Sequence, residues 1–142
     1  MVHRNDMAVI RRLLTTPGTW AVAGLSTNIA RPAYGVARLL IDRLGLRVLP
    51  VHPRAETVFG EPGHASLAQL PDGTCVDVVD CFVNSTRVGA VVDEAIEQRE
   101  RLGITAVWLQ VGVIDEQAAQ RAKAAGLRVV MDTCPAIEYP RL

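Results

Sequence analysis

Five short apolar runs alternate with segments of helical periodicity, and this alternation most constrains how the chain folds. The helical segments end at glycines such as Gly45 and Gly126, which stop a helix before the next run begins. Alternating strands and helices are typical of βαβ units, whose right-handed crossovers place helices on both faces of a sheet. We predict an α/β, Rossmann-like three-layer fold with a mostly parallel five-stranded sheet, as a single domain over residues 1–142. The predicted strands lie at residues 19–23, 46–51, 76–82, 105–109 and 127–131.

Several local signals refine this pattern. Residues 1–4 are expected to be frayed, with Asn5 or Asp6 capping a first helix that ends at residues 16–18. Pro50 cannot donate a hydrogen bond to a neighbouring strand, so we expect the second strand to end or bend there. A short helix is predicted at residues 66–70, and none is predicted in the tail after residue 131.

Composition and charge exclude several classes of protein. The 15 Lys and Arg residues balance 15 Asp and Glu residues, so a general nucleic-acid binder is not expected. The chain has an odd number of cysteines, namely Cys75, Cys81 and Cys134, and no two of them have C-x-x-C spacing. This pattern argues against a disulfide framework or a zinc site. Neither a signal peptide nor a run long enough to span a membrane is present, so we expect a cytoplasmic protein that does not bind membranes.

The loop after the first strand is the first candidate ligand site. Gly24, Leu25, Ser26 and Thr27 follow an apolar run and precede a helix, the usual geometry of a nucleotide phosphate site. Only one glycine of a G-x-G-x-x-G pattern is present, so an ordinary structural turn is an alternative interpretation.

Two side chains at the start of the following helix join this candidate site. Arg31 has the chemistry to hold a phosphate with two hydrogen bonds, although a solvated surface arginine would look the same in sequence. Tyr34 lies one turn further on. Pro32 is sufficient by itself to begin the helix.

The end of the second strand indicates which nucleotide would bind. A NAD-binding unit carries an acidic residue there to bind the ribose hydroxyls. This chain instead has His52, Pro53 and Arg54. A cation suits a phosphate on the ribose, as found in NADP and in coenzyme A (CoA), whereas a surface arginine in a loop remains the alternative.

The turn after the third strand contributes a further candidate group, while the case for catalysis is weak. Val83, Asn84 and Ser85 lie where the next helix begins, either as caps alone or as caps that also face the ligand. His52 and His64 have no partnered nucleophile in the sequence pattern, and the cysteines are more typical of buried, inert thiols. No catalytic residue and no metal ligand is predicted, and we expect no catalytic activity of the protein's own.

Six segments together resemble those of one protein family. They are residues 21–26, Arg31-Pro32 with 34–37, 51–53, 78–80, 106–112 and 130–135. In this combination the chain resembles the CoA-binding domain family, small single-domain proteins related to the N-terminal domain of the succinyl-CoA synthetase alpha subunit. The Trp-Leu-Gln-x-Gly and Asp-x-Cys-Pro segments, together with Arg-Pro after the glycine loop, carry most of the resemblance.

The resemblance implies that CoA, an acyl-CoA or a CoA disulfide binds at the carboxyl ends of the strands. Gly24, Leu25 and Ser26 would hold phosphate, Arg54 would lie near the nucleotide end, and residues 83–85 would line the cofactor. The synthetase also has a second domain with a phosphorylatable histidine and a partner subunit. These 142 residues do not include such a domain, so synthetase activity is not expected.

We therefore expect a CoA-binding protein with a carrier, sensor or accessory role. A NADP-dependent oxidoreductase and a regulatory module without a ligand are the alternatives. The expected partner is a small-molecule nucleotide, and a homo-oligomer or a protein partner is possible. The expected ligand-binding residues are Gly24, Leu25, Ser26, Thr27, Arg31, Tyr34, Pro53, Arg54, Val83, Asn84 and Ser85.

Overall fold

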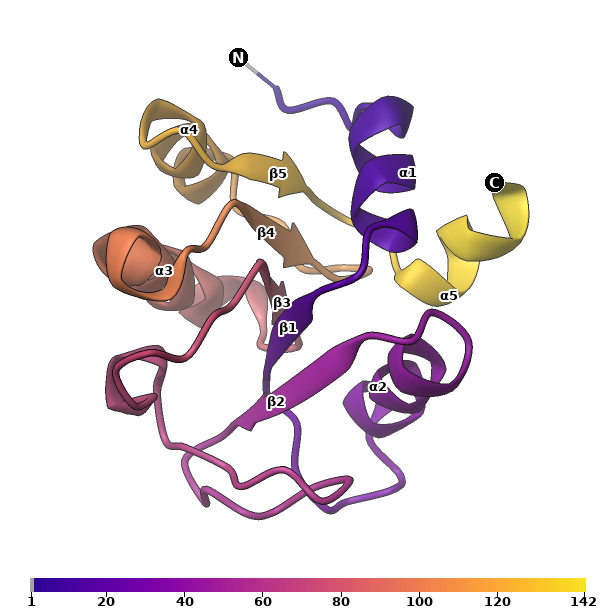
Figure 1. Cartoon of the computed structure of the whole chain (residues 1–142). Helices are drawn as coiled ribbons and strands as arrows, with labels where there is room; N and C mark the ends of the chain where they lie inside the picture. The colour runs from indigo at the N-terminus through magenta and orange to yellow at the C-terminus, as the bar shows by residue number, and fades with distance from the viewer. Residues whose placement is uncertain (1) are drawn as a thin grey trace.

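A five-stranded sheet forms the middle layer of the molecule (Figure 1). The computed structural model describes residues 2–142. The strand order is β2-β1-β3-β4-β5, and every pairing in it is parallel. The predicted Rossmann-like fold is therefore confirmed. The strands are β1 (Thr19–Ala23), β2 (Arg47–Val51), β3 (Val78–Cys81), β4 (Ala106–Leu109) and β5 (Arg128–Val130).

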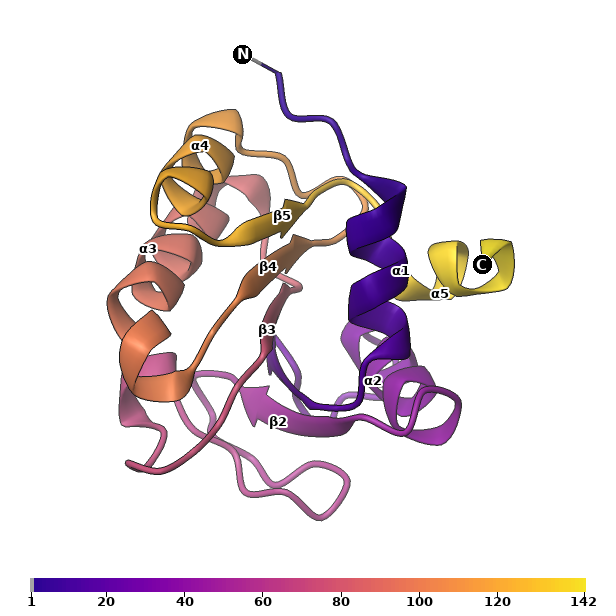
Figure 2. The same cartoon turned by 45° about the horizontal axis from the view of Figure 1, so that its top comes forward.

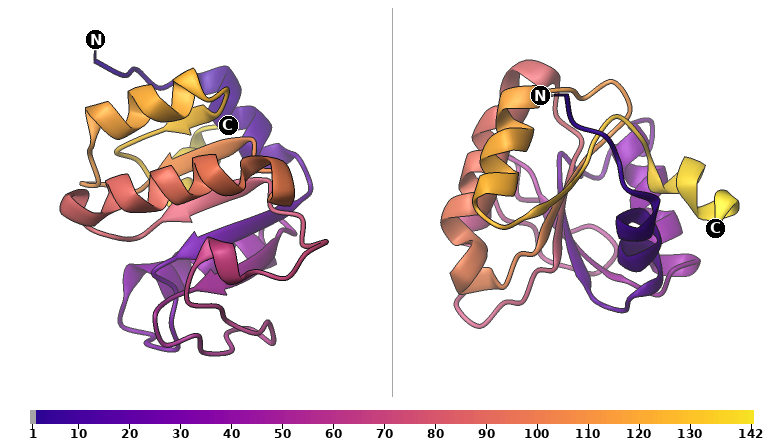
Figure 3. Two further views of the ribbon diagram at one scale, coloured as in Figure 1. Left: turned by 90° about the vertical axis from the view of Figure 1, so that its left-hand side faces the viewer. Right: turned by 90° about the horizontal axis from the view of Figure 1, so that it is seen from above.

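Helices cover both faces of the sheet, as Figure 3 shows from above. The helices α3 (Ser85–Leu102) and α4 (Glu116–Ala124) pack on one face, through residues such as Val92 and Ala118. The other face is covered by α1 (Met7–Thr15), α2 (Pro32–Asp42) and the short α5 (Pro135–Glu138). Because both faces are covered, the strands consist almost entirely of buried residues.

Two 3₁₀ turns complete the chain. One, η1 (Leu67–Gln69), lies within the short helix predicted at residues 66–70. The other, η2 (Tyr139–Arg141), follows α5 in the tail, where no helix was predicted. Pro135 occupies the first turn of α5, where the missing N–H of proline costs nothing.

The prediction that β2 ends or bends at Pro50 is wrong, because β2 is an edge strand. Pro50 pairs with Val22 of β1 inside the ladder. Its carbonyl oxygen accepts a hydrogen bond from the His64 N–H on the outer side of the strand, at 3.2 Å. The N–H that proline lacks would point to the same outer side, so the bonds between β2 and β1 do not need it.

The opposite edge of the sheet is closed by a side chain from the N-terminal segment, which passes beside β5 (Figure 2). The Asn5 amide donates to the Met131 carbonyl oxygen at 2.8 Å and accepts from the Met131 N–H at 2.9 Å. Asp6 therefore caps α1 alone, accepting from the Ala8 N–H at 2.8 Å. Met1, part of the segment expected to be frayed, lies outside the described residues.

The ends of β1 and β3 approach each other closely at Gly24. This residue has φ +99°, and a Cβ on it would lie 2.5 Å from the Phe82 carbonyl oxygen. A side chain is excluded both by the left-handed backbone and by this contact. Gly45 offers a matched comparison, since it has φ +67° with no atom within 4 Å of its Cβ position.

We therefore predict that Gly24→Ala destabilises the protein more than Gly45→Ala does. Strain alone should cost Gly45→Ala roughly 1 kcal/mol in the free energy of unfolding. The backbone contact should add roughly 1–3 kcal/mol more in Gly24→Ala. Urea unfolding of both variants measures the difference. Equal losses in the free energy of unfolding would show that the ends of β1 and β3 can move apart to accept a side chain at little cost.

Candidate functional site

A cleft of about 1300 Å³ opens at the carboxyl ends of the strands. The strand order reverses between β1 and β3, so α2 and α3, which follow these strands, lie on opposite faces of the sheet. Their N-termini flank the cleft, which residues from both helices line. In open α/β sheets this reversal point is where ligands bind.

Ser26 is the loop residue best placed to bind an anion. It lines the cleft, and its N–H donates no hydrogen bond to any of residues 2–142. Gly24 also lines the cleft, but its N–H donates to the Val51 carbonyl oxygen at 2.7 Å. Leu25 is buried in the core, so its side chain does not face the cleft. Ser26 rather than Gly24 therefore supplies the available backbone donor.

At the start of α2, Arg31 and Pro32 line the cleft. The aromatic ring of Tyr34 packs instead against Phe59, with ring centroids 4.7 Å apart, and it is not among the lining residues. Arg31 thus brings a positive charge to the same helix end whose N–H groups favour an anion.

Thr27 is not among the residues that line the cleft, and it binds Glu56. The Thr27 N–H and hydroxyl donate to the Glu56 carboxylate at 3.3 and 3.1 Å. These hydrogen bonds hold the pKa of Glu56 below its usual value, and the charges of Arg54 and His52 contribute. A carboxylate thus lies at the corner where the sequence indicates only cations. Glu56 was missed because it lies in an irregular segment without periodicity.

At the end of β2, the two predicted binding residues, Pro53 and Arg54, are placed differently. His52 and Pro53 line the cleft. Arg54 is exposed beside it, with its backbone N–H donating to Nδ1 of His52 at 3.1 Å. From this position the flexible Arg54 side chain lies outside the cleft wall.

On the α3 side, Val83 and Asn84 line the cleft. The Asn84 side chain caps α3 by accepting from the Arg87 N–H at 3.1 Å. The Ser85 hydroxyl donates to the Gly112 carbonyl oxygen at 3.1 Å and accepts from the Ile114 N–H at 3.0 Å. Ser85 therefore fixes the loop after β4 and is not among the lining residues.

The structure thus brings together six of the predicted site residues and places five outside the cleft wall. The cleft-lining residues are Gly24, Ser26, Arg31, Pro53, Val83 and Asn84. The residues outside it are Leu25, Thr27, Tyr34, Arg54 and Ser85. Their roles in binding stay predictions.

The predicted binding residues did not include the polar floor of the cleft. Gln110 and Cys134 line it, and Asp80 lies behind them, fully buried in β3. The Gln110 Nε2 donates to Asp80 Oδ1 at 2.5 Å, while Asp80 Oδ2 has no partner among the described residues. Burial raises the pKa of Asp80 to about 7, and the Gln110 hydrogen bond opposes that rise.

The two buried thiols near this floor are poor nucleophiles. Burial raises the pKa of Cys81, and the Asp80 charge adds to the effect. Burial also raises the pKa of Cys134, again with a contribution from Asp80. Both residues therefore remain in the thiol form near neutral pH, whereas the thiolate is the reactive form.

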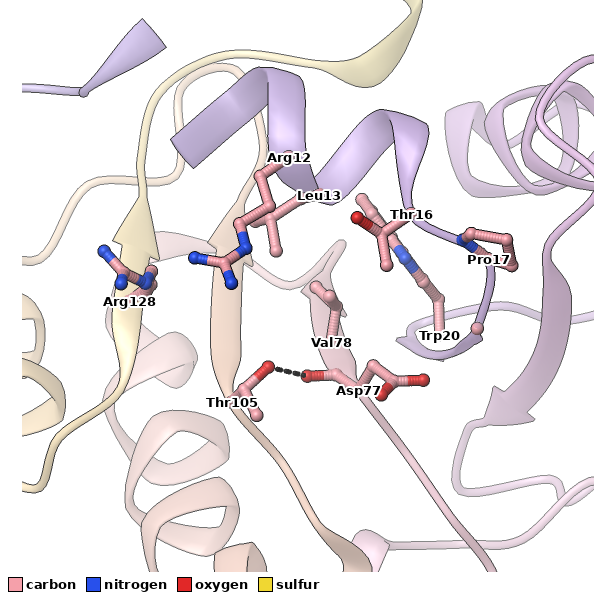
Figure 4. Close-up of a pocket in the computed structure, with 10 residues that line it drawn as sticks. Arg12, Leu13, Thr16, Pro17, Trp20, Asp77, Val78, Thr105 and Arg128 are labelled. Carbon is pink, nitrogen blue, oxygen red and sulfur yellow. Dashed lines mark hydrogen bonds between the residues drawn. The ribbon is translucent and has the colours of Figure 1, made fainter. Parts of the chain in front are cut away.

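A second, smaller cavity of about 260 Å³ lies at the opposite, amino ends of the strands (Figure 4). Arg12 and Arg128 line it, and neither forms an ion pair within residues 2–142. The Asp77 carboxylate accepts from the Thr19 N–H at 2.8 Å, and the Asp77 carbonyl oxygen accepts from the Thr105 hydroxyl at 3.1 Å. Asp77 thus joins the starts of neighbouring strands.

Residues 2–142 contain no group of three or more side chains suited to hold a metal ion. In the same range, no helix has the length and apolar character that crossing a membrane requires.

Comparison with known proteins identifies the family. The model of the CoA binding domain family matches residues 18–140. The chain belongs to the CoA binding domain family. The match runs from the residue before β1 to the tail, so it includes the whole cleft of this CoA binding domain.

Individual relatives match over nearly the same length. The uncharacterized protein YneT of Bacillus subtilis is 31% identical over 133 residues, covering 94% of this chain and 93% of YneT. A hypothetical protein from Pyrococcus horikoshii OT3 is 32% identical with a TM-score of 0.85, covering 97% of this chain and 92% of that one. A protein from Thermus thermophilus is 34% identical with a TM-score of 0.82, covering 96% and 98%.

The raised pKa of Asp80 predicts a pH-dependent stability. The folded protein keeps the Asp80 proton up to about pH 7, whereas the unfolded chain loses it near its ordinary value of about 4. Folding therefore takes up a proton between these values, and stability from this group falls as pH rises. The neutral variant Asp80→Asn lacks this dependence.

When the pH falls from about 8 to about 5, the free energy of unfolding of wild type should rise by roughly 2–3 kcal/mol relative to that of Asp80→Asn. Urea unfolding of both proteins at each pH measures the change, and other titrating groups cancel in the difference. A difference that does not change with pH would mean that Asp80 stays ionised in the folded protein.

Proposed function

We propose that this protein binds CoA or a CoA derivative in the cleft, as a carrier, sensor or accessory protein of the cytoplasm. Membership of the CoA binding domain family supports CoA as the ligand. The observation that carries the proposal is the meeting of Ser26 and Arg31 at the N-terminus of α2, inside the large cleft.

The charges of the cleft suit the chemistry of CoA. The pyrophosphate would lie against the Ser26 N–H and the first turn of α2, where Arg31 adds a cation. The nucleotide end would lie toward His52 and Pro53, within reach of Arg54 for the ribose phosphate. The uncharged pantetheine arm would cross the N-terminus of α3 toward Val111, in the uncharged part of the wall.

The test is a calorimetric titration with CoA, acetyl-CoA and NADPH. We expect CoA and acetyl-CoA to bind and NADPH to bind weakly or not at all. Tight binding of NADPH alone would favour the oxidoreductase alternative, and the absence of heat with every ligand would favour a module without a nucleotide.

We predict that Arg31→Gln weakens CoA binding roughly ten- to a hundredfold, because a charge-assisted hydrogen bond contributes roughly 1.5–3 kcal/mol. Arg38→Gln is the matched control on the same helix, since Arg38 pairs with Asp42 at 3.3 Å on the exposed face. Equal affinities of the two variants would contradict the role given to Arg31.

Arg54 is tested with a pair of ligands. If Arg54 contacts the 3′-phosphate, Arg54→Glu weakens CoA by about tenfold and dephospho-CoA by much less, because only CoA has that phosphate. Calorimetry with both ligands measures the two losses. An equal loss for both would show that Arg54 acts only through the general charge of the cleft.

A further inference from the structure

The buried carboxylate of Asp80 lies directly behind the cleft wall and determines how one wall residue is oriented. Asp80 has no exposed surface, and its single described side-chain partner is Gln110. An ionised carboxylate only accepts hydrogen bonds. It therefore binds the Nε2 side of the Gln110 amide rather than the Oε1 side, as the structure has it.

This orientation leaves the Gln110 Oε1 as an unused acceptor at the cleft. No donor within residues 2–142 forms a hydrogen bond with this oxygen. The oxygen nevertheless keeps some solvent-accessible surface. Gln110 itself lines the cleft. Its Oε1 is therefore accessible from the cleft and able to accept a hydrogen bond from a ligand.

The surroundings of Gln110 favour a neutral donor on that ligand. Val111, Gly112 and Val113 follow it along the wall, and Ile137 and Cys134 lie on the wall near by. None of these side chains carries a charge. The arginines that line the cleft, Arg31 and Arg87, lie instead at the starts of α2 and α3. A ligand group at Gln110 is thus expected to be uncharged and to carry a donor such as an amide N–H.

We propose that Asp80 is a positioning residue that holds the Gln110 amide with Oε1 toward the cleft, where it accepts a hydrogen bond from an amide N–H of the ligand. In CoA the pantetheine arm supplies such amides. This inference rests on the proposed function and deepens it, because it assigns recognition of the pantetheine arm to a pair of residues. Gln110 would discriminate CoA from nucleotides without that arm.

Protonation of Asp80 would reverse the arrangement. A neutral carboxyl group can donate to Oε1, which lets the amide turn and present Nε2 to the cleft. Burial, with a contribution from the Asp80 charge, raises the pKa values of the neighbouring Cys81 and Cys134 thiols, so both stay neutral near neutral pH. The state of Asp80 itself therefore controls the Gln110 amide.

The test compares two ligands and three variants by calorimetry. CoA is compared with adenosine 3′,5′-bisphosphate, which lacks the pantetheine arm. Gln110→Met removes the amide at nearly constant volume, and Asp80→Asn lets the amide adopt both orientations. Gln117→Met, the same change at an exposed position of α4, is the matched control.

At about pH 8 we expect Gln110→Met to weaken CoA about tenfold and Asp80→Asn about threefold, the range of one hydrogen bond. Both variants should bind adenosine 3′,5′-bisphosphate as wild type does, and Gln117→Met should bind both ligands normally. At about pH 6 the difference between wild type and Asp80→Asn in CoA affinity should disappear, because wild-type Asp80 is then largely protonated.

Three results would overturn the inference while leaving CoA binding intact. They are unchanged CoA affinity in Gln110→Met, an equal loss for both ligands, or an effect of Asp80→Asn that does not depend on pH. If Asp80→Asn does not fold, Gln110→Met with the two ligands decides the question alone. Failure of wild type to bind CoA would instead overturn the proposed function.

Discussion

The close contact between the ends of β1 and β3 at Gly24 determines the geometry of the whole cleft. Because β3 follows β2 in the chain but lies on the other side of β1, the helices after β1 and β3 pack on opposite faces. Gly24 lets the two strand ends meet without a side chain between them. The N-termini of α2 and α3 therefore open onto one shared space.

The cleft that results is chemically uneven along its length. Its arginines, Arg31 and Arg87, lie at the starts of α2 and α3, whereas the wall formed by the residues after β4 is uncharged. Asp80 is the exception behind that wall, and keeping a carboxylate there costs stability above neutral pH. Such a cost is common where a residue serves a ligand rather than the fold.

Much of the fold could be predicted because it depends on local patterns, whereas several site features depend on distant contacts. Ser26 and Arg31 were predicted from their place between a strand and a helix. Gln110 and Asp80 lie thirty positions apart and meet only because β3 and β4 pair. Glu56 reaches Thr27 from an irregular loop, which no periodicity reveals. Pro50 was misjudged because a sequence does not say which strand lies at an edge.

An NMR titration of the ¹⁵N-labelled protein with CoA tests most directly where the ligand binds. We expect the largest amide shifts at residues that line the cleft, namely Ser26, Ala33, Asn84 and Gly112. Ala33 also lies in the first turn of α2. Shifts confined to the cavity at the amino ends of the strands, around Arg12 and Arg128, would contradict this expectation. So would a spectrum that does not change at saturating CoA.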